Sequence, residues 1–159
     1  INEGDRFVNR LPDVIAANDT DHGVQWADFD QDGDLDLALA ANDPAGSHYL
    51  FRNELDAAAA ARSVQVLVLD ENGHYTRAGS EVRVYRAGTD SLIGLRMVDT
   101  GGGYNAQNAM PVHFGLPEAV AIDVHVTVLT PGGRRTQIYR NVDWRSLNGK
   151  PFIVRTALR

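Results

Sequence analysis

Aspartates at alternate positions in one short stretch constrain this chain more than any other feature of its sequence. In an extended strand, alternate side chains project from the same face, about 7 Å apart. So many negative charges in one row would repel one another strongly. We therefore expect the backbone to curl around a cation here, and the alternative is a solvated acidic turn. The five residues are Asp28, Asp30, Asp32, Asp34 and Asp36.

The chemistry of these side chains predicts which cation they bind. A set of oxygen donors without nitrogen or sulfur favours a hard divalent ion. Calcium accepts about 6–8 oxygens in irregular geometry and fits such a loop better than magnesium. Gly33 permits the sharp turn. We expect the first three aspartates to bind Ca²⁺ through their side chains, the fourth through its main-chain carbonyl, and the fifth to complete the shell.

The pattern differs from that of an EF-hand. An EF-hand loop ends on a bidentate glutamate at its twelfth position. Counting from Asp28, that position is Leu39. The residues after the loop alternate between leucine and small or acidic side chains, which is typical of a strand and not of a helix. The sequence therefore predicts a strand–loop–strand calcium site.

The charge is divided unevenly along the chain. The net charge is −6, but residues 1–56 hold 13 acidic and 3 basic side chains, which leaves −10, and residues 57–159 carry +4. We therefore expect two units, 1–56 and 57–159. A globally acidic chain argues against a nucleic-acid partner.

Because there is no cysteine, disulfide frameworks and thiol catalysis are excluded. No apolar run is long enough to span a bilayer, so we expect no membrane insertion. The first residue is Ile1, and we expect a processed or partial chain.

Short strands dominate the pattern. Apolar alternation predicts strands at 24–28, 35–41, 48–52, 63–69, 80–86, 91–98, 120–130, 134–141 and 151–157, with a further one around residue 113. Glycine-rich turns separate many of them. The alanine-rich stretch 54–62 predicts a short linker helix. In residues 120–130, alternate apolar side chains predict one buried and one mostly wet face, which favours an antiparallel sheet. We therefore predict an all-β fold.

Two stretches of the first unit resemble an FG-GAP/VCBS repeat. They are GVQWADFDQDGDLDL at residues 23–37 and HYLFRN at residues 48–53, and the resemblance covers about residues 5–53. Such repeats are blades of extracellular β-propellers with calcium in an inter-strand loop. The resemblance thus implies one β-propeller-type blade with a calcium loop. A propeller has typically 4–8 blades, and this chain shows one such loop. The other blades, or a protein partner, are therefore expected to pack on it.

The second unit resembles the ASPIC/UnbV domain, which commonly follows such propellers. The matching stretches are RAGSEVRVY at 77–85, DTGGGYNAQN at 99–108 and VHFGL at 112–116. At 129–132 the chain has LTPG where family members often have Trp-Pro-Ser-Gly. For 57–159 we expect an antiparallel β-sandwich or barrel that serves as an extracellular interaction module.

Several polar residues of the second unit are weaker candidates for a ligand site. The glycines at 101–103 precede an aromatic and two amides, which could recognise a glycan or peptide together with a nearby arginine. The alternative is a structural loop. The glycan candidates are Arg96, Tyr104, Asn105 and Gln107. We expect His113, Trp26 and Trp144 to be structural.

No catalytic motif is recognisable. The sequence has no Gly-x-Ser-x-Gly, His-Glu-x-x-His or P-loop pattern. Carboxylates that bind calcium stay ionised and cannot act as a general acid. We therefore expect no enzyme but a calcium-binding module for adhesion or assembly, or a structural subunit of a larger complex, located outside the cell, at the cell surface or in the periplasm. The alternative is an accessory glycan-binding domain of a secreted enzyme.

Overall fold

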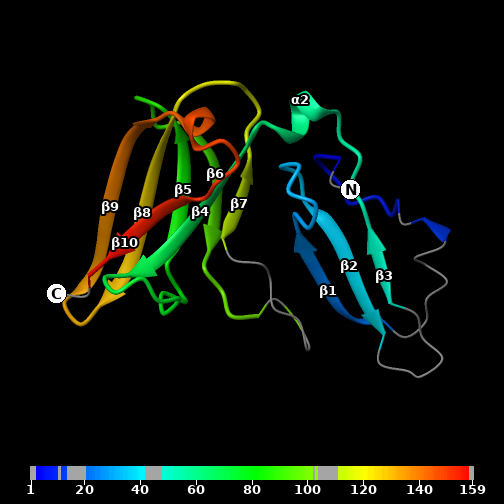
Figure 1. Ribbon diagram of the computed structural model, residues 1–159, viewed down its shortest axis with the longest axis horizontal. Helices are drawn as coiled ribbons and strands as arrows, with labels where there is room; N and C mark the ends of the chain where they lie inside the picture. Colours follow the sequence, from blue (N-terminus) through cyan, green and yellow to red (C-terminus); the bar gives the residue numbers. More distant parts are fainter. Residues whose placement is uncertain are drawn as a thin grey trace.

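The computed structural model describes residues 3–10, 12–13, 21–41, 48–101, 103 and 111–157. Figure 1 shows two bodies joined by a short segment that contains the helix α2. The elements are β1 (Asp21–Ala27), β2 (Asp36–Ala41), β3 (Tyr49–Phe51), α2 (Ala57–Ala60), β4 (Ser63–Asp70), β5 (Glu81–Arg86), β6 (Leu92–Met97), β7 (Val112–Gly115), β8 (Ile122–Thr130), β9 (Gly133–Val142), the short 3-10 helix η1 (Trp144–Leu147) and β10 (Phe152–Thr156). The predicted all-β character is confirmed.

The first body, called the N-terminal sheet below, has three antiparallel strands in the order β1-β2-β3. β1 and β2 are joined by residues 28–35, so the acidic stretch is the connection between two neighbouring strands. Trp26 pairs with Leu37, which in turn pairs with Phe51. These three side chains share one face of the sheet, because directly paired residues point to the same side.

The second body, called the C-terminal part below and comprising residues 63–157, has two open sheets. Their strand orders are β10-β4-β7 and β6-β5-β8-β9. All pairings are antiparallel except that of β4 with β10, which is parallel. The sequence-based prediction of a purely antiparallel domain is wrong at this pair, and neither sheet closes into a barrel. Parallel neighbours need a long connection, and here the rest of the domain provides it.

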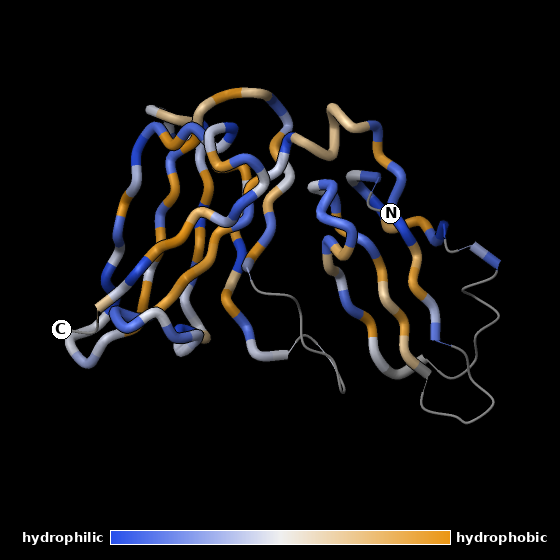
Figure 2. The backbone as a smooth tube through the Cα atoms, viewed as in Figure 1, coloured by the Kyte–Doolittle hydropathy of each residue, from blue (hydrophilic) through white to orange (hydrophobic). Residues whose placement is uncertain are grey.

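Apolar side chains from both sheets form one core. Val64, Val66 and Val68 project from β4, and Val124 and Val126 from β8, each at most 3% exposed. Figure 2 shows the alternation of hydrophobic and hydrophilic residues along these strands. The buried face predicted for β8 is confirmed, and its burial drives the two sheets together.

The other face of β8 is drier than expected. Asp123 is buried there, and its carboxylate accepts hydrogen bonds from the main-chain nitrogens of Asn141 (2.7 Å) and Gly88 (3.2 Å). These bonds, the Asn141 one first, lower the pKa of Asp123. Thr127 is also buried and bonds Thr136 of β9 at 2.9 Å. A buried polar group is tolerated when it is hydrogen-bonded in this way.

The predicted linker helix is confirmed but shorter than residues 54–62. The helix α2 has a single turn, and the Asp56 carboxylate caps it by accepting from the main-chain nitrogens of Ala58 and Ala59. Such a cap supplies partners for otherwise unpaired N–H groups. Within the described part of the chain, no helix has the length and apolar character that crossing a bilayer requires.

The turn after β4 is held by one carboxylate. Asp70 accepts from the main-chain nitrogens of His74 (2.8 Å) and Asn72 (2.9 Å) and from the Thr76 hydroxyl (3.0 Å). The His74 bond foremost, with the others, lowers the pKa of Asp70 from its ordinary value of 3.8 to about 2. The ionised form is therefore the one that the folded state stabilises.

We expect Asp70→Asn to lower the thermal unfolding midpoint at neutral pH. Because the pKa of Asp70 is depressed on folding, its contribution is fully present above pH 3.8 and is lost as the pH falls towards about 2. The difference between wild type and variant should shrink over that window in melts followed by circular dichroism. Glu71→Gln removes the same charge from an exposed neighbour and serves as the control. A difference that stayed constant down to pH 2 would contradict the assignment.

Candidate functional site: the acidic loop

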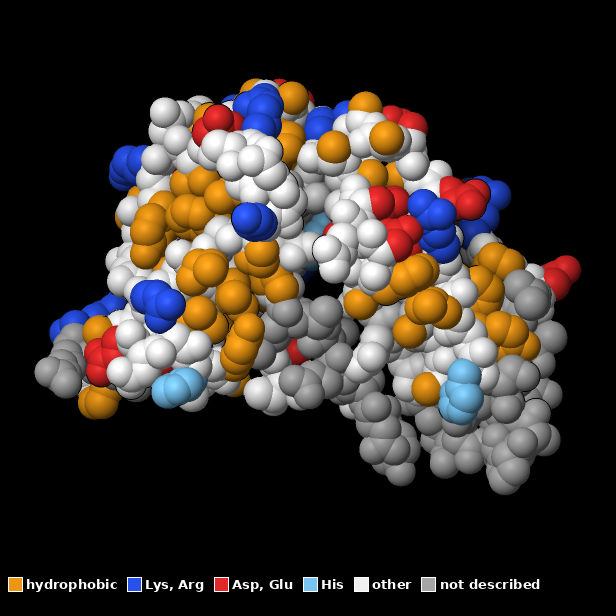
Figure 3. Space-filling model, in the orientation of Figure 1, with side chains coloured by type: hydrophobic (Ala, Val, Ile, Leu, Met, Phe, Trp, Pro, Cys, Tyr) orange, Lys and Arg blue, Asp and Glu red, His pale blue; other side chains and the backbone are white. Residues whose placement is uncertain are grey.

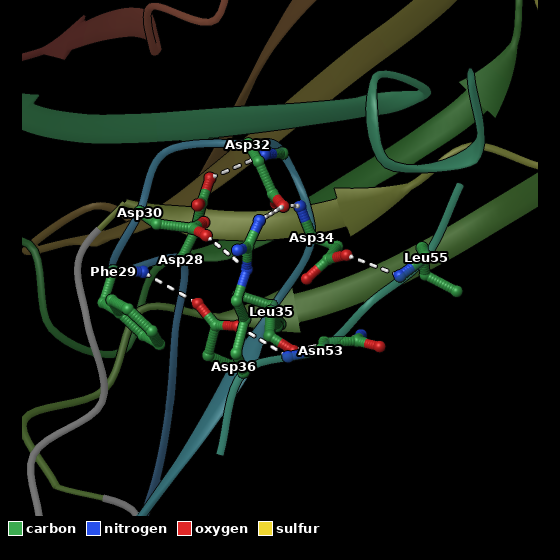
Figure 4. A network of polar contacts seen from close by, with 11 residues as sticks. Asp28, Phe29, Asp30, Asp32, Asp34, Leu35, Asp36, Asn53 and Leu55 are labelled. Carbon is green, nitrogen blue, oxygen red and sulfur yellow. Dashed lines mark hydrogen bonds and ion pairs between the residues drawn. The ribbon is translucent and has the colours of Figure 1, made fainter. Parts of the chain in front are cut away.

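The acidic loop, residues 28–36, brings together part of the aspartate set that the sequence singled out. One carboxylate oxygen from each of Asp28, Asp30 and Asp36 lies within 4.8 Å of the other two. Figure 4 shows these side chains converging from the ends of β1 and β2. A divalent cation bound by carboxylates requires such a convergence of oxygens.

The loop folds on its own side chains. Asp28 accepts from the main-chain nitrogen of Gly33 (3.2 Å), and Asp32 accepts from that of Asp34 (3.1 Å). Asp36 accepts from the nitrogen of Phe29 at 3.1 Å, which ties the end of the loop to its beginning. Gly33 has a φ of +103°, a backbone conformation that glycine adopts without strain. The sharp turn predicted at Gly33 is therefore present.

Two carboxylate oxygens of the loop are buried without a hydrogen-bond partner. They are Oδ1 of Asp28 and Oδ1 of Asp34. The Asp34 side chain is 3% exposed. Burial, followed by the negative charge of Asp32 among other causes, raises the pKa of both Asp28 and Asp34. A buried anionic oxygen without a donor is costly, and a bound cation would remove that cost. The donor set therefore fits a hard divalent ion.

The Asp34 side chain also has a structural role that the sequence did not suggest. Its Oδ2 accepts from the main-chain nitrogen of Leu55 at 3.3 Å. Asp36 accepts from the nitrogen of Asn53 at 2.8 Å, and the Asn53 amide donates to the Leu35 carbonyl at 3.3 Å. The acidic loop thus binds the segment that leads from β3 to the helix α2.

Within the residues that the structure describes, one basic side chain pairs with the carboxylates of the loop. The Arg52 guanidinium is 2.8 Å from an Asp30 oxygen and 3.7 Å from an Asp32 oxygen. A single positive charge leaves the five carboxylates of the loop largely uncompensated. Sequence reasoning did not identify Arg52, because its approach depends on the pairing of β3 with β2.

The C-terminal part contacts the loop through two polar side chains. Nε2 of His113, from β7, is 2.8 Å from the Gly33 carbonyl oxygen. The Gln65 amide, from β4, donates to Asp28 at 3.3 Å. Gln65 and His113 are direct partners in the pairing of β4 with β7. His113 is hydrogen-bonded, as predicted, but its partner is the acidic loop.

A cleft of about 1230 Å³ lies between the two bodies, next to the loop. Figure 3 shows the hollow between them. Its lining includes Trp26, Asp32, Met97, His113 and Lys150.

The Trp26 side chain is 51% exposed, so the prediction that it anchors packing is wrong. Trp144 is buried and donates to the Val120 carbonyl at 2.8 Å, as expected of an anchor.

The candidate glycan residues are only partly described. Arg96 lines the cleft from β6, with its guanidinium 5.7 Å from the centre of the Phe114 ring. Tyr104, Asn105 and Gln107 lie outside the described residues. The structure therefore shows one member of this group beside the cleft.

The comparisons with known proteins concern the C-terminal part. A search of curated proteins finds no match to the chain. A family model described as ASPIC and UnbV matches residues 71–148, a region that runs from the turn after β4 to the end of η1. This match supports the resemblance of the second unit to the ASPIC and UnbV family over these residues.

Proposed function

We propose that this chain is a non-catalytic, extracellular calcium-binding module that mediates adhesion or assembly. The observation that carries the proposal is the buried, unpartnered Oδ1 of Asp28, a member of the three aspartates whose carboxylate oxygens converge within 4.8 Å. Asp28, Asp30 and Asp36 would hold the ion, with Asp32 and the Asp34 main chain completing its shell. Calcium would supply the positive charge that the loop lacks.

The proposed location outside the cell rests on the weak binding that is expected of a simple calcium loop. Extracellular calcium modules bind with dissociation constants of about 0.1–1 mM, which suits compartments rich in free calcium. The same carboxylates are unsuited to acid–base catalysis, because ligands of a metal ion remain ionised. We therefore propose no enzymatic activity for the loop.

The N-terminal sheet offers surfaces for a protein partner. On one face Val24 is 49% exposed and Trp26 51%, and on the other Leu50 is 60% exposed. A sheet with apolar side chains on both faces is typical of a layer packed between others. These surfaces support further propeller blades of an FG-GAP/VCBS type, or another protein, as the partner.

Titration calorimetry with calcium tests the proposal directly. We expect one ion per chain, and Asp30→Asn should weaken binding at least about tenfold because a charged ligand becomes neutral. Asp30 is suited to the test because its carboxylate pairs with the exposed Arg52 side chain, so the substitution removes no bond to the backbone of the loop that these contacts describe. Asp90→Asn makes the same charge change on an exposed turn and should bind as the wild type does. Absence of binding heat, together with an unchanged melting midpoint in calcium, would overturn the proposal.

Replacing Arg52 by glutamine should strengthen calcium binding. The Arg52 guanidinium repels a bound divalent ion. If the two charges are about 6 Å apart in a medium of high dielectric constant, removing this repulsion strengthens binding by about 1 kcal/mol, or about fivefold in affinity. The gain should decline as salt is added, because the two charges are then screened from one another. Arg135→Gln, an exposed position on β9, is the matched control. Weaker binding in Arg52→Gln would show instead that the guanidinium orients Asp30.

A second candidate function is glycan recognition as an accessory domain of a secreted enzyme. The half-exposed Trp26 ring and Arg96 both line the cleft, and aromatic rings with charged neighbours are common in ligand sites. A glycan array with wild type, Trp26→Ala and Tyr104→Ala tests this function. Hits that both variants retain would exclude it.

A further inference from the structure

The acidic loop contacts the segment that connects the two bodies and two strands of the C-terminal part. Within the described residues, the loop bonds to the connecting segment through Asp34 and Leu55, to β4 through Asp28 and Gln65, and to β7 through the Gly33 carbonyl. A Cβ atom placed on Gly33 would lie 2.5 Å from the carbonyl oxygen of Ala60, the last residue of α2. The loop therefore lies at the joint of the molecule.

From this placement we propose that cation binding to the acidic loop fixes the orientation of the N-terminal sheet against the C-terminal part. This inference rests on the proposed function. An ion between the carboxylates would hold the loop backbone in one shape, and the Gly33 carbonyl would then face His113. Without the ion, repulsion among the aspartates favours more open loop shapes, in which these contacts are weaker.

The position of the two polar partners supports the coupling. Val64 and Val66 on β4 point into the core, so Gln65 between them points to the opposite side of the sheet. His113 lies directly across from Gln65 and is half-buried. This pair gives the outer side of the sheet a specific polar contact with the loop, which an apolar surface would not provide.

The cleft depends on the same joint. Asp28, Gly33, Gln65 and His113 all line it. Any rotation of one body against the other changes the distance between its walls. Calcium would therefore set the shape of the cleft as well as the stability of the loop, because a ligand shifts an equilibrium by its differential affinity for the two states.

Distances between spin labels test this coupling. The chain has no cysteine, so Leu50→Cys on β3 and Ile153→Cys on β10 place a single label on each body. Both side chains are exposed, at 60% and 53%. In saturating calcium we expect a distance distribution about half as wide as in chelator, as for a shift from several orientations to one.

A variant with Gln65→Ala and His113→Ala separates ion binding from orientation. At saturating calcium its distribution should stay as wide as that of the wild type in chelator. Because coupling is reciprocal, its calcium affinity should fall about fivefold or more. Gln137→Ala, on β9, is the control and should behave as the wild type.

The outcomes distinguish the two proposals. If no calcium binds in calorimetry, the proposed function fails and this inference fails with it. If calcium binds but the wild-type distribution is unchanged, the coupling alone is overturned. A narrow distribution in the Gln65 and His113 variant would likewise overturn it. The wild-type comparison needs no altered joint, so the test stands even if that variant does not fold.

Discussion

Gly33→Ala is expected to abolish the proposed calcium binding at millimolar concentrations and to destabilise the joint between the two bodies. The φ of +103° disfavours any L side chain, by at least about 1–2 kcal/mol. The new methyl group would also meet the Ala60 carbonyl at 2.5 Å, a contact with backbone that cannot rotate away. The loop must therefore move, and its aspartates would no longer converge. Calorimetry and thermal melts with and without calcium measure both effects.

Gly115→Ala is the matched control for this substitution. Gly115 lies on β7, and a Cβ atom there would have no neighbour within 4 Å. Such a change reduces the freedom of the unfolded chain and should be neutral or slightly stabilising. Normal calcium binding by Gly33→Ala would show that the loop does not need its present conformation to hold the ion.

Phe114→Ala is expected to cost about 3–5 kcal/mol of unfolding free energy, as for other buried aromatic side chains. Phe114 is 2% exposed and belongs to the core between the two sheets of the C-terminal part. Gly94 on β6 leaves room for its ring, since a Cβ there would be 3.0 Å from it. Domains of this size are commonly stable by about 5–15 kcal/mol, so the loss is a large share. Urea denaturation measures the cost.

Ile153→Ala is the companion variant for Phe114→Ala. The Ile153 side chain on β10 is 53% exposed, so its truncation should cost less than about 1 kcal/mol. A similar loss for both variants would mean that the core does not lie where the buried residues place it. Because Phe114 is next to His113, the Phe114 variant should also weaken the contact with the acidic loop.

The strands could be predicted from the sequence because their signal is local. In β8, alternate valines occupy the buried face as the pattern requires. The parallel pairing of β10 with β4 could not be predicted, since it joins segments far apart and no local pattern records which strands are neighbours. The burial of Asp123 was also unforeseen, because its donors come from other elements.

The acidic loop was predictable for the same reason, and its surroundings were not. Asp28, Asp30 and Asp36 are close in sequence, so the turn at Gly33 is enough to bring their carboxylates together. Arg52, Gln65 and His113 reach the loop only through strand pairing and the placement of one body on the other. Residue type gave a hint for His113, which was expected to be hydrogen-bonded, but gave no indication of its partner.

The parallel strand β10 has a consequence for folding during synthesis. Thr156 bonds the Leu69 carbonyl across 87 residues, and the buried guanidinium of Arg77 donates to Thr156 in turn. At about 5–20 residues per second, a ribosome needs roughly 4–17 seconds to make the intervening chain. During that interval one edge of β4 has no neighbour, and its valines are accessible to chaperones. The sheet β10-β4-β7 of the nascent chain is thus complete only after β10 has emerged.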